Sequence, residues 1–321
     1  MKIGLIDVDG HNYPNLPLMK LSAWHKAQGD EVEWWRPQAS WYDRVYQARV
    51  FSPAYSKEPP LPLNAAEVVR GGSSYAIRTV NGREIFDAER HKNLPNDVEH
   101  MYPDYTLYPE FCENTAYGFL TRGCPRGCSF CHVAAKEGRS SRKVADLDEF
   151  WSGQRHIVLC DPNLLACHDA SSLLDQLADS KARIELNQGI DARLITDSVA
   201  ARLARLKLVK VHFAMDTIEQ AAAVAKGLER YRLAITESGK KWRDRDHTVY
   251  VLTNFNTTHA QDMERVTLLN ALGYWPYIMI YDKPHAQQIT RRLQRWCNNI
   301  ILRLKYKTFD EFMTHEYGVA V

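Results

Sequence analysis

The sequence lacks several features that would place the protein in a broad class at once. No apolar run in its 321 residues approaches the roughly 18 residues needed to span a bilayer. Acidic residues follow the N-terminal methionine too closely for a signal peptide. The formal net charge is only +2 and low-complexity segments are absent, so the overall composition supports no nucleic-acid partner. We therefore expect a cytoplasmic protein without a membrane or nucleic-acid partner.

Cysteine first appears at position 112 and occurs seven times, which is an odd number. Three cysteines cluster in GCPRGCSFCHV, residues 123–133, without any secretory context. A disulfide framework explains such a cluster poorly, and metal or redox chemistry explains it better. The remaining four have apolar neighbours and are interpreted as small core residues: Cys112, Cys160, Cys167 and Cys297.

From residue 116 onward, short apolar runs alternate with helical patterns. The apolar runs predict six strands, at 116–122, 156–160, 183–188, 208–215, 248–253 and 277–281. Amphipathic segments between them, several of which open on a capping residue, predict helices. A succession of βα units implies right-handed crossovers and a parallel sheet. The series favours a barrel or partial barrel over residues 116–285, with an open doubly wound sheet as the alternative.

The chain before the barrel predicts a small Rossmann-like α/β domain over residues 1–80. Its apolar runs predict strands, and residues 16–30 predict a helix that stops at a glycine. Residues 81–115 are rich in turn formers and predict a connecting segment. Basic and aromatic residues in 286–321 predict an amphipathic helical extension, which we favour over a nucleic-acid surface.

Polar residues follow the predicted strands, where a (β/α) barrel places its active site. The cysteine cluster follows the first strand of the series. Later strands are followed by Asp161, Asn163, Asn187, Gln188, Asp191, Asp216, Asn254 and Asp282. We expect all of these side chains at one rim of the barrel.

Three thiolates at this spacing can bind zinc or an iron–sulfur cluster. Structural zinc needs a fourth ligand, and His132, the adjacent candidate, cannot easily face the metal that Cys131 binds. A four-iron cluster held by three thiolates leaves one iron open to a non-protein ligand. Gly123 and Gly127 suit a loop that wraps tightly around such a cluster.

The pattern Cys-x3-Cys-x-aromatic-Cys, formed by Cys124, Cys128, Phe130 and Cys131, resembles the signature of the radical S-adenosylmethionine superfamily. The resemblance covers residues 116–285 and implies a partial (β/α)6 TIM-like barrel. It implies an enzyme whose three cysteines hold a [4Fe–4S] cluster, with S-adenosylmethionine bound to the open iron. Reductive cleavage would give a 5′-deoxyadenosyl radical that acts on a substrate still unknown. A one-electron donor such as a flavodoxin or ferredoxin is the implied partner.

The resemblance also suggests contacts to S-adenosylmethionine near the cluster. Phe130 is expected near the adenine. Where the family often has Gly-Gly-Glu after the second strand, this chain has LCDPNLLA, so Asp161 or Asn163 is the candidate acceptor for the methionine amine. Lys136 and Arg139 either face the carboxylate or cover a loop.

Further candidate contacts follow the third and fourth strands. Gln188, Asp191 and Arg193 are candidate nucleotide contacts, and Asp216 is a candidate ribose contact. The alternative for these residues is that they cap a strand or begin a helix.

The N-terminal segment resembles the cobalamin-binding domain that precedes the barrel in one radical S-adenosylmethionine class. That domain has a DxHxxG motif after its first strand and a Gly-Gly pair after a later one. Asp9 and His11 match the first motif, Pro14 replaces its glycine, and Gly71 and Gly72 match the pair. We interpret the segment as a degenerate cap that keeps the domain's shape without the vitamin, and His11 as a loop histidine.

Two alternatives stay open. The first is a cobalamin-dependent radical S-adenosylmethionine methyltransferase, in which the N-terminal segment binds the vitamin. The second is a zinc- or cluster-stabilised binding protein that catalyses no reaction.

Overall fold

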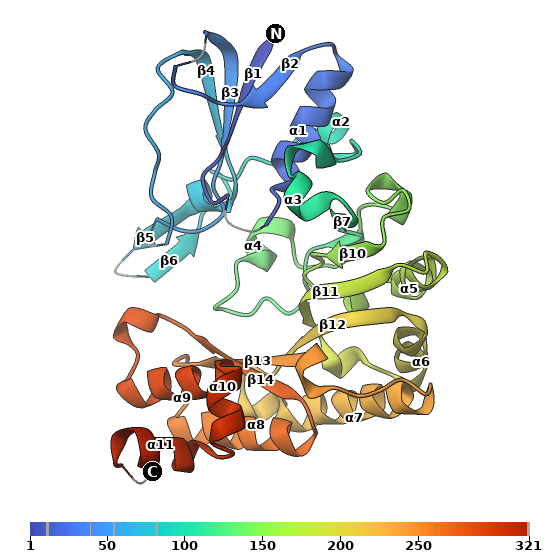
Figure 1. Cartoon of the computed structure of the whole chain (residues 1–321), viewed down its shortest axis with the longest axis vertical. Helices are drawn as coiled ribbons and strands as arrows, with labels where there is room; N and C mark the ends of the chain where they lie inside the picture. The colour runs from blue at the N-terminus through green and yellow to red at the C-terminus, as the bar shows by residue number, and fades with distance from the viewer. Residues whose placement is uncertain (11–12, 39, 54, 81–82, 320–321) are drawn as a thin grey trace. The chain divides into compact units, whose positions relative to one another are not determined.

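The computed structural model describes residues 1–10, 13–38, 40–53, 55–80 and 83–319. It forms two compact units, Met1–Asp169 and Ala170–Val321, and each combines helices with a parallel sheet (Figure 1). No helix in these ranges is long and apolar enough to cross a membrane.

The first unit begins with a four-stranded parallel sheet in the order β2-β1-β3-β4 (Figure 1). Its strands are β1 (Lys2–Asp7), β2 (Glu31–Trp34), β3 (Tyr42–Ala48) and β4 (Ala65–Gly71). Helix α1 (Leu16–Ala27) begins where the Asn15 side chain accepts a hydrogen bond from the Leu18 amide. Its buried face packs against Ile3 and Leu5 of the sheet and against Val98 of α2 (Asn96–Glu99).

The rest of the first unit leads to the cysteines. Its elements are the antiparallel pair β5 (Ile77–Val80) and β6 (Arg83–Phe86), helix α3 (Pro109–Cys112), the parallel pair β7 (Thr115–Gly118) and β10 (His156–Leu159), the antiparallel pair β8 (Thr121–Arg122) and β9 (Arg142–Lys143), and helix α4 (Val133–Glu137). A second apolar cluster joins Leu16 and Met19 of α1 to Tyr117 of β7 and Val158 of β10. The N-terminal sheet and the β7–β10 pair therefore share a packed core.

The second unit is built on a parallel sheet formed by β11 (Arg183–Ile190), β12 (Lys207–Ala214), β13 (His247–Thr253) and β14 (Trp275–Ile280). Its helices are α5 (Ala170–Asp179), α6 (Asp197–Arg205), α7 (Ala221–Glu237), α8 (His259–Ala271), α9 (Gln288–Asn298), α10 (Ile300–Lys305) and α11 (Phe309–Tyr317). Strand residues such as Val211, Phe213 and Val249 are fully buried, and β12 and β13 each contain continuous buried stretches.

Helix α7 lies unusually close to the short 3-10 helix η5 (Ala192–Leu194) that follows β11. A Cβ atom at Gly227 would lie 1.8 Å from the Ala192 carbonyl oxygen, so only glycine fits there. Gly227 thereby lets α7 support the segment that carries Asp191 and Arg193.

The six strands predicted after residue 116 are all present, and the predicted α/β fold class is confirmed. The third predicted strand, 183–188, already contains Asn187 and Gln188, so the expectation that these two side chains follow a strand end is wrong. Strand β11 includes both residues and continues to Ile190 through an irregularity between Leu186 and Gly189. The domain boundaries at 80/81, 115/116 and 285/286 stay a prediction.

Candidate functional site: a closed cysteine loop

The three clustered cysteines lie in one loop, residues 123–141, which we call the cysteine loop. Strands β8 and β9 pair directly before and after it and close its base. Inside the loop, the Cys124 amide donates to the Gly138 carbonyl over 3.2 Å, at the end of α4. The loop is therefore held in shape by backbone hydrogen bonds of its own.

Two glycines allow the cysteine loop to fold tightly. Gly123 has φ +88°, and a Cβ there would lie 2.2 Å from the Ser140 carbonyl oxygen. Gly127 has φ +57°, and a Cβ there would lie 2.3 Å from Nη2 of Arg139. Both positions favour glycine for its conformation, and Gly123 also for the close approach of the Ser140 backbone. Arg139 thus covers the loop at Gly127, which is one of its two predicted placements.

The three cysteines of the loop differ in exposure: Cys124 and Cys128 are partly buried and Cys131 is exposed. No three Cys, His, Asp or Glu side chains in the described ranges come close enough to hold a single metal ion. A [4Fe–4S] cluster binds each thiolate through a different iron, so three cysteines on one closed loop fit such a cluster as a donor set. The His132 ring faces Phe86, with ring centroids 6.0 Å apart.

Asp161 supports the chain just before the cysteine loop. Its buried carboxylate accepts hydrogen bonds from the Leu120 amide (3.1 Å), the Thr121 amide (2.5 Å) and the Thr121 hydroxyl (2.7 Å). Burial raises the pKa of this carboxyl group to about 6, although these hydrogen bonds oppose the shift. Both carboxylate oxygens are therefore engaged in fixing the turn that enters β8.

Asn163 reaches the first cysteine of the loop. Its side-chain amide donates from Nδ2 to Cys124 Sγ over 3.4 Å, and its main-chain carbonyl accepts from Ser141 Oγ over 2.9 Å. Its Oδ1 has no hydrogen-bond partner among the described residues, although the side chain is only 3% exposed. Leaving a buried amide oxygen unpaired costs about 1–3 kcal/mol, so this acceptor suits a donor from a bound molecule.

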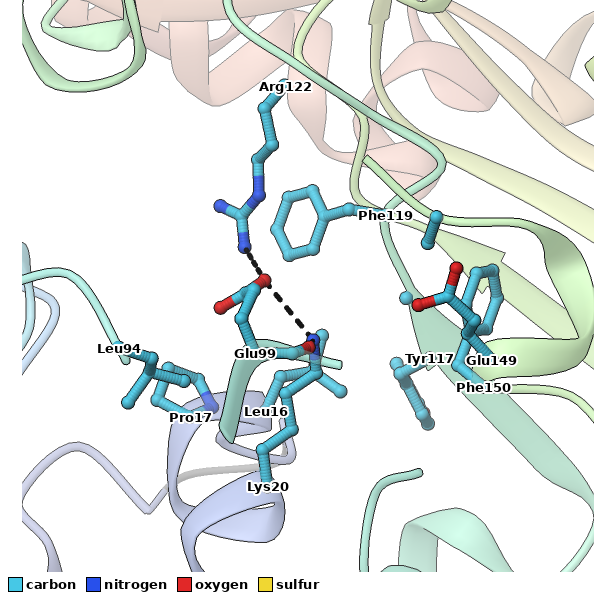
Figure 2. Close-up of a pocket in the computed structure, with 12 residues that line it drawn as sticks. Leu16, Pro17, Lys20, Leu94, Glu99, Tyr117, Phe119, Arg122, Glu149 and Phe150 are labelled. Atoms are coloured by element: carbon cyan, nitrogen blue, oxygen red, sulfur yellow. Dashed lines mark hydrogen bonds and ion pairs between the residues drawn. The ribbon is translucent and has the colours of Figure 1, made fainter. Parts of the chain in front are cut away.

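Arg122, the residue before the loop, ties it to neighbouring helices. Its guanidinium lies 3.0 Å from Glu137 of α4 and 3.5 Å from Glu99 of α2, and it stacks over the Phe119 ring. Figure 2 shows Arg122, Glu99 and Lys20 around a cavity of about 30 Å³. Ligand pockets are usually about 300–1,000 Å³, so this cavity is too small for a substrate.

Lys136 lies in α4 on the same loop. Its ammonium is 3.9 Å from the Glu137 carboxylate, and burial lowers its pKa. A partly desolvated ammonium whose counter-ion lies as far away as 3.9 Å is suited to an anionic ligand group.

The other candidate contacts lie in the second unit. Gln188 is exposed on β11. Asp191 caps η5 by accepting from the Arg193 amide over 3.2 Å, and it also pairs with the Arg193 guanidinium at 2.7 and 3.0 Å. Asp216 follows β12, and burial raises its pKa to about 6 against the opposing charges of Arg193 and Arg265. Asp191 therefore makes the predicted capping contact, and Asp191, Arg193 and Asp216 share one charged environment.

The sequence analysis did not identify a buried arginine near the carboxyl ends of β12 and β13. Arg265 of α8 is fully buried and donates to the carbonyls of Met215 (2.9 Å), Asp216 (2.7 Å) and Leu252 (2.9 Å). It also pairs with Asp262, which is 2% exposed. Arg265 thus fixes the ends of β12 and β13. Nothing in the amino-acid sequence of α8 distinguishes Arg265 from a solvent-exposed helical arginine.

A second group of polar residues lies at the carboxyl edge of the N-terminal sheet. The Asp9 carboxylate accepts from the amides of Val50 and Phe51, just after β3. Within the described ranges, four buried polar atoms at this edge lack a hydrogen-bond partner: Asp9 Oδ1, Arg49 Nε, Ser52 Oγ and Ser74 Oγ. No described atom lies within 4 Å of a Cβ built on Gly71. His11, the other motif residue predicted here, lies outside the described residues.

Solved structures of a radical S-adenosylmethionine methyltransferase share this fold. They are structures of TsrM from Kitasatospora setae. One, with cobalamin and a [4Fe–4S] cluster bound, superposes with a TM-score of 0.63 at 13% identity and covers 87% of this chain and 72% of that one. Another, with tryptophan substrate and the S-adenosylmethionine analogue aza-SAM bound, has a TM-score of 0.61 at 14% identity. The match covers 86% of this chain and 72% of the TsrM chain. The likeness in fold confirms the predicted architecture.

No family model matches the chain, and no curated protein matches it by sequence.

Proposed function

We propose that the protein is a radical S-adenosylmethionine enzyme whose [4Fe–4S] cluster is held by Cys124, Cys128 and Cys131. The observation that carries the proposal is the closed cysteine loop with its three cysteines, beside which Asn163 Oδ1 is a buried acceptor without a partner among the described residues. The fold shared with TsrM supports it. When bound, such a cluster supplies the electron that cleaves S-adenosylmethionine to a 5′-deoxyadenosyl radical.

The chain's own residues divide the binding of S-adenosylmethionine in a definite way. Asn163 Oδ1 accepts a hydrogen bond from the methionine ammonium, because it is the buried acceptor without a donor. Asp161 is the less suitable of the two predicted acceptors, since its oxygens already hold the turn at Thr121. Lys136 offers its partly desolvated ammonium to the carboxylate. Phe130, next to the third cysteine, contacts the adenine.

In the second unit, the predicted candidates for contact with the nucleotide are Gln188, Asp191, Arg193 and Asp216. Asp216 accepts from the ribose hydroxyls, and Gln188 offers an exposed amide. Asp191 and Arg193 form an ion pair, so they present a fixed pair of charges to the nucleotide. The substrate is unassigned, and the electron comes from a small donor protein such as a flavodoxin or ferredoxin.

Anaerobic reconstitution tests the proposal. The purified chain is expected to bind about four irons per protein molecule. With dithionite and S-adenosylmethionine, it is expected to release 5′-deoxyadenosine and methionine, which chromatography and mass spectrometry measure. A chain that binds about four irons and releases no 5′-deoxyadenosine would contradict the proposal. So would a chain that takes up zinc in place of iron.

A second candidate function, cobalamin-dependent methyl transfer, is favoured by the N-terminal sheet. In the order β2-β1-β3-β4 the topology reverses between β1 and β3, and ligands of open α/β sheets bind at such a point. Asp9, Arg49 and Ser52 lie there with unpaired buried atoms that call for a ligand bearing both donors and acceptors. The amide-rich periphery of a corrinoid offers both, and one TsrM structure has cobalamin bound.

Corrinoid binding distinguishes the two candidates. If the second is correct, the chain purified with hydroxocobalamin keeps about one corrinoid per molecule. Replacement of Ser74, 1% exposed, by leucine is then expected to lower corrinoid retention at least tenfold by filling the site, while bound iron is unchanged. The absorption spectrum after gel filtration measures both. A chain that elutes with iron and without corrinoid would instead support the interpretation that the N-terminal segment is a degenerate cap without the vitamin.

A further inference from the structure

We propose that Asn163 sets the reduction potential of the cluster through its Nδ2–H···Sγ hydrogen bond to Cys124. The inference rests on the proposed function, because it concerns a sulfur that binds the cluster. It adds a role for the amide nitrogen that is separate from the acceptor role of Oδ1.

The geometry singles out this hydrogen bond. Asn163 occupies the N-cap position of η4 (Leu164–Ala166), where an asparagine side chain usually accepts from the helix backbone. Here the side chain makes no such cap, and its amide points to Cys124 Sγ, 3.4 Å away. The main-chain carbonyl of Asn163 accepts from Ser141 Oγ over 2.9 Å and from the Ala166 amide over 3.3 Å. The backbone that carries the donor is therefore anchored by contacts that do not involve the sulfur.

The electrostatic consequence has a definite sign. An N–H donor on a ligating sulfur stabilises the additional negative charge of the reduced cluster, and this raises the reduction potential. Asn163 is 3% exposed, so water does not replace the hydrogen bond and the local dielectric constant is low. Removing the donor must therefore make the cluster harder to reduce.

Potentiometric titration of the reconstituted protein, followed by electron paramagnetic resonance without S-adenosylmethionine, tests this inference. Asn163→Ala is expected to lower the one-electron reduction equilibrium constant about tenfold, which corresponds to 59 mV. Asn163→Asp is expected to lower it further, because it replaces the donor by a negative charge of nearly the same shape. Ser141→Ala is the matched control, since it removes a contact to the same residue that does not involve sulfur. Its potential is expected to stay at the wild-type value.

The outcomes separate the two proposals. Equal potentials in wild-type and Asn163→Ala proteins that both hold the cluster would overturn this inference and leave the proposed function standing. An equal shift in Ser141→Ala would also overturn it, because loop position would then explain the effect. Wild-type protein without a cluster would overturn both. If Asn163→Ala binds no cluster, the near-isosteric Asn163→Asp carries the test.

Discussion

Replacing Cys128 by alanine is expected to abolish cluster binding and all release of 5′-deoxyadenosine. Cys128 follows Gly127 in the tightest part of the cysteine loop, and Cys131 hydrogen-bonds back to its carbonyl over 3.0 Å. Two thiolates leave two irons of the cluster without a protein ligand. Iron content is therefore expected to fall more than tenfold, as measured by a colorimetric iron assay and by absorbance near 400 nm.

Cys297→Ser provides the matched control for that loss. Cys297 is fully buried in α9, donates to the Pro276 carbonyl over 3.2 Å, and has its pKa raised by burial to about 12. A thiol that stays protonated is unsuited to binding iron, and serine keeps the donor. Iron content and 5′-deoxyadenosine release are expected to match wild type. Retention of the full iron content by Cys128→Ala would show that the loop is not the cluster site.

The largest effect on stability is expected from Arg265→Met in the second unit. The change leaves the Asp262 carboxylate buried at 2% exposure without its cation. It also removes donors from the carbonyls of Met215 and Leu252, which Arg265 holds at the ends of β12 and β13. Breaking a buried pair by removing one partner costs about 3–5 kcal/mol. We expect a loss of that size in the free energy of unfolding, measured by urea denaturation.

Arg205→Met is the matched comparison for Arg265→Met. Arg205 is also helical and pairs with an aspartate, Asp175, at 2.6 Å, but its side chain is 56% exposed. Exposed pairs contribute about 0–1 kcal/mol, so this variant is expected to unfold almost like wild type. The double variant Arg265→Met/Asp262→Leu is expected to recover part of the stability. Equal losses for Arg205→Met and Arg265→Met would refute the assigned role of Arg265.

Much of the fold could be predicted because buried parallel strands require continuous apolar runs, and each of the six runs after residue 116 corresponds to a strand. The alternation of these runs with amphipathic segments identified the βα succession. Strand ends were less certain. Strand β11 continues beyond residue 188 to Ile190 with a register shift near Gly189, and such irregularities leave no trace in the apolar pattern.

The candidate site also has a part that the sequence predicted and a part that it did not. The spacing of the cysteines and their glycines predicted the loop, because this pattern lies within one short stretch of sequence. Asp161 and Asn163 were equivalent candidates in the sequence. Only the fold brings Asp161 to the Thr121 amide and Asn163 to Cys124, over separations of about 40 residues. Arg265 was missed for a similar reason, since its partners come from two other strands.

The β8–β9 pair that closes the cysteine loop has a consequence for maturation. The β8–β9 pairing and the hydrogen bonds to Asp161 and Asn163 are made by the polypeptide itself. If the proposed cluster binds here, its removal is therefore expected to leave these hydrogen bonds in place, because none of them depends on the metal.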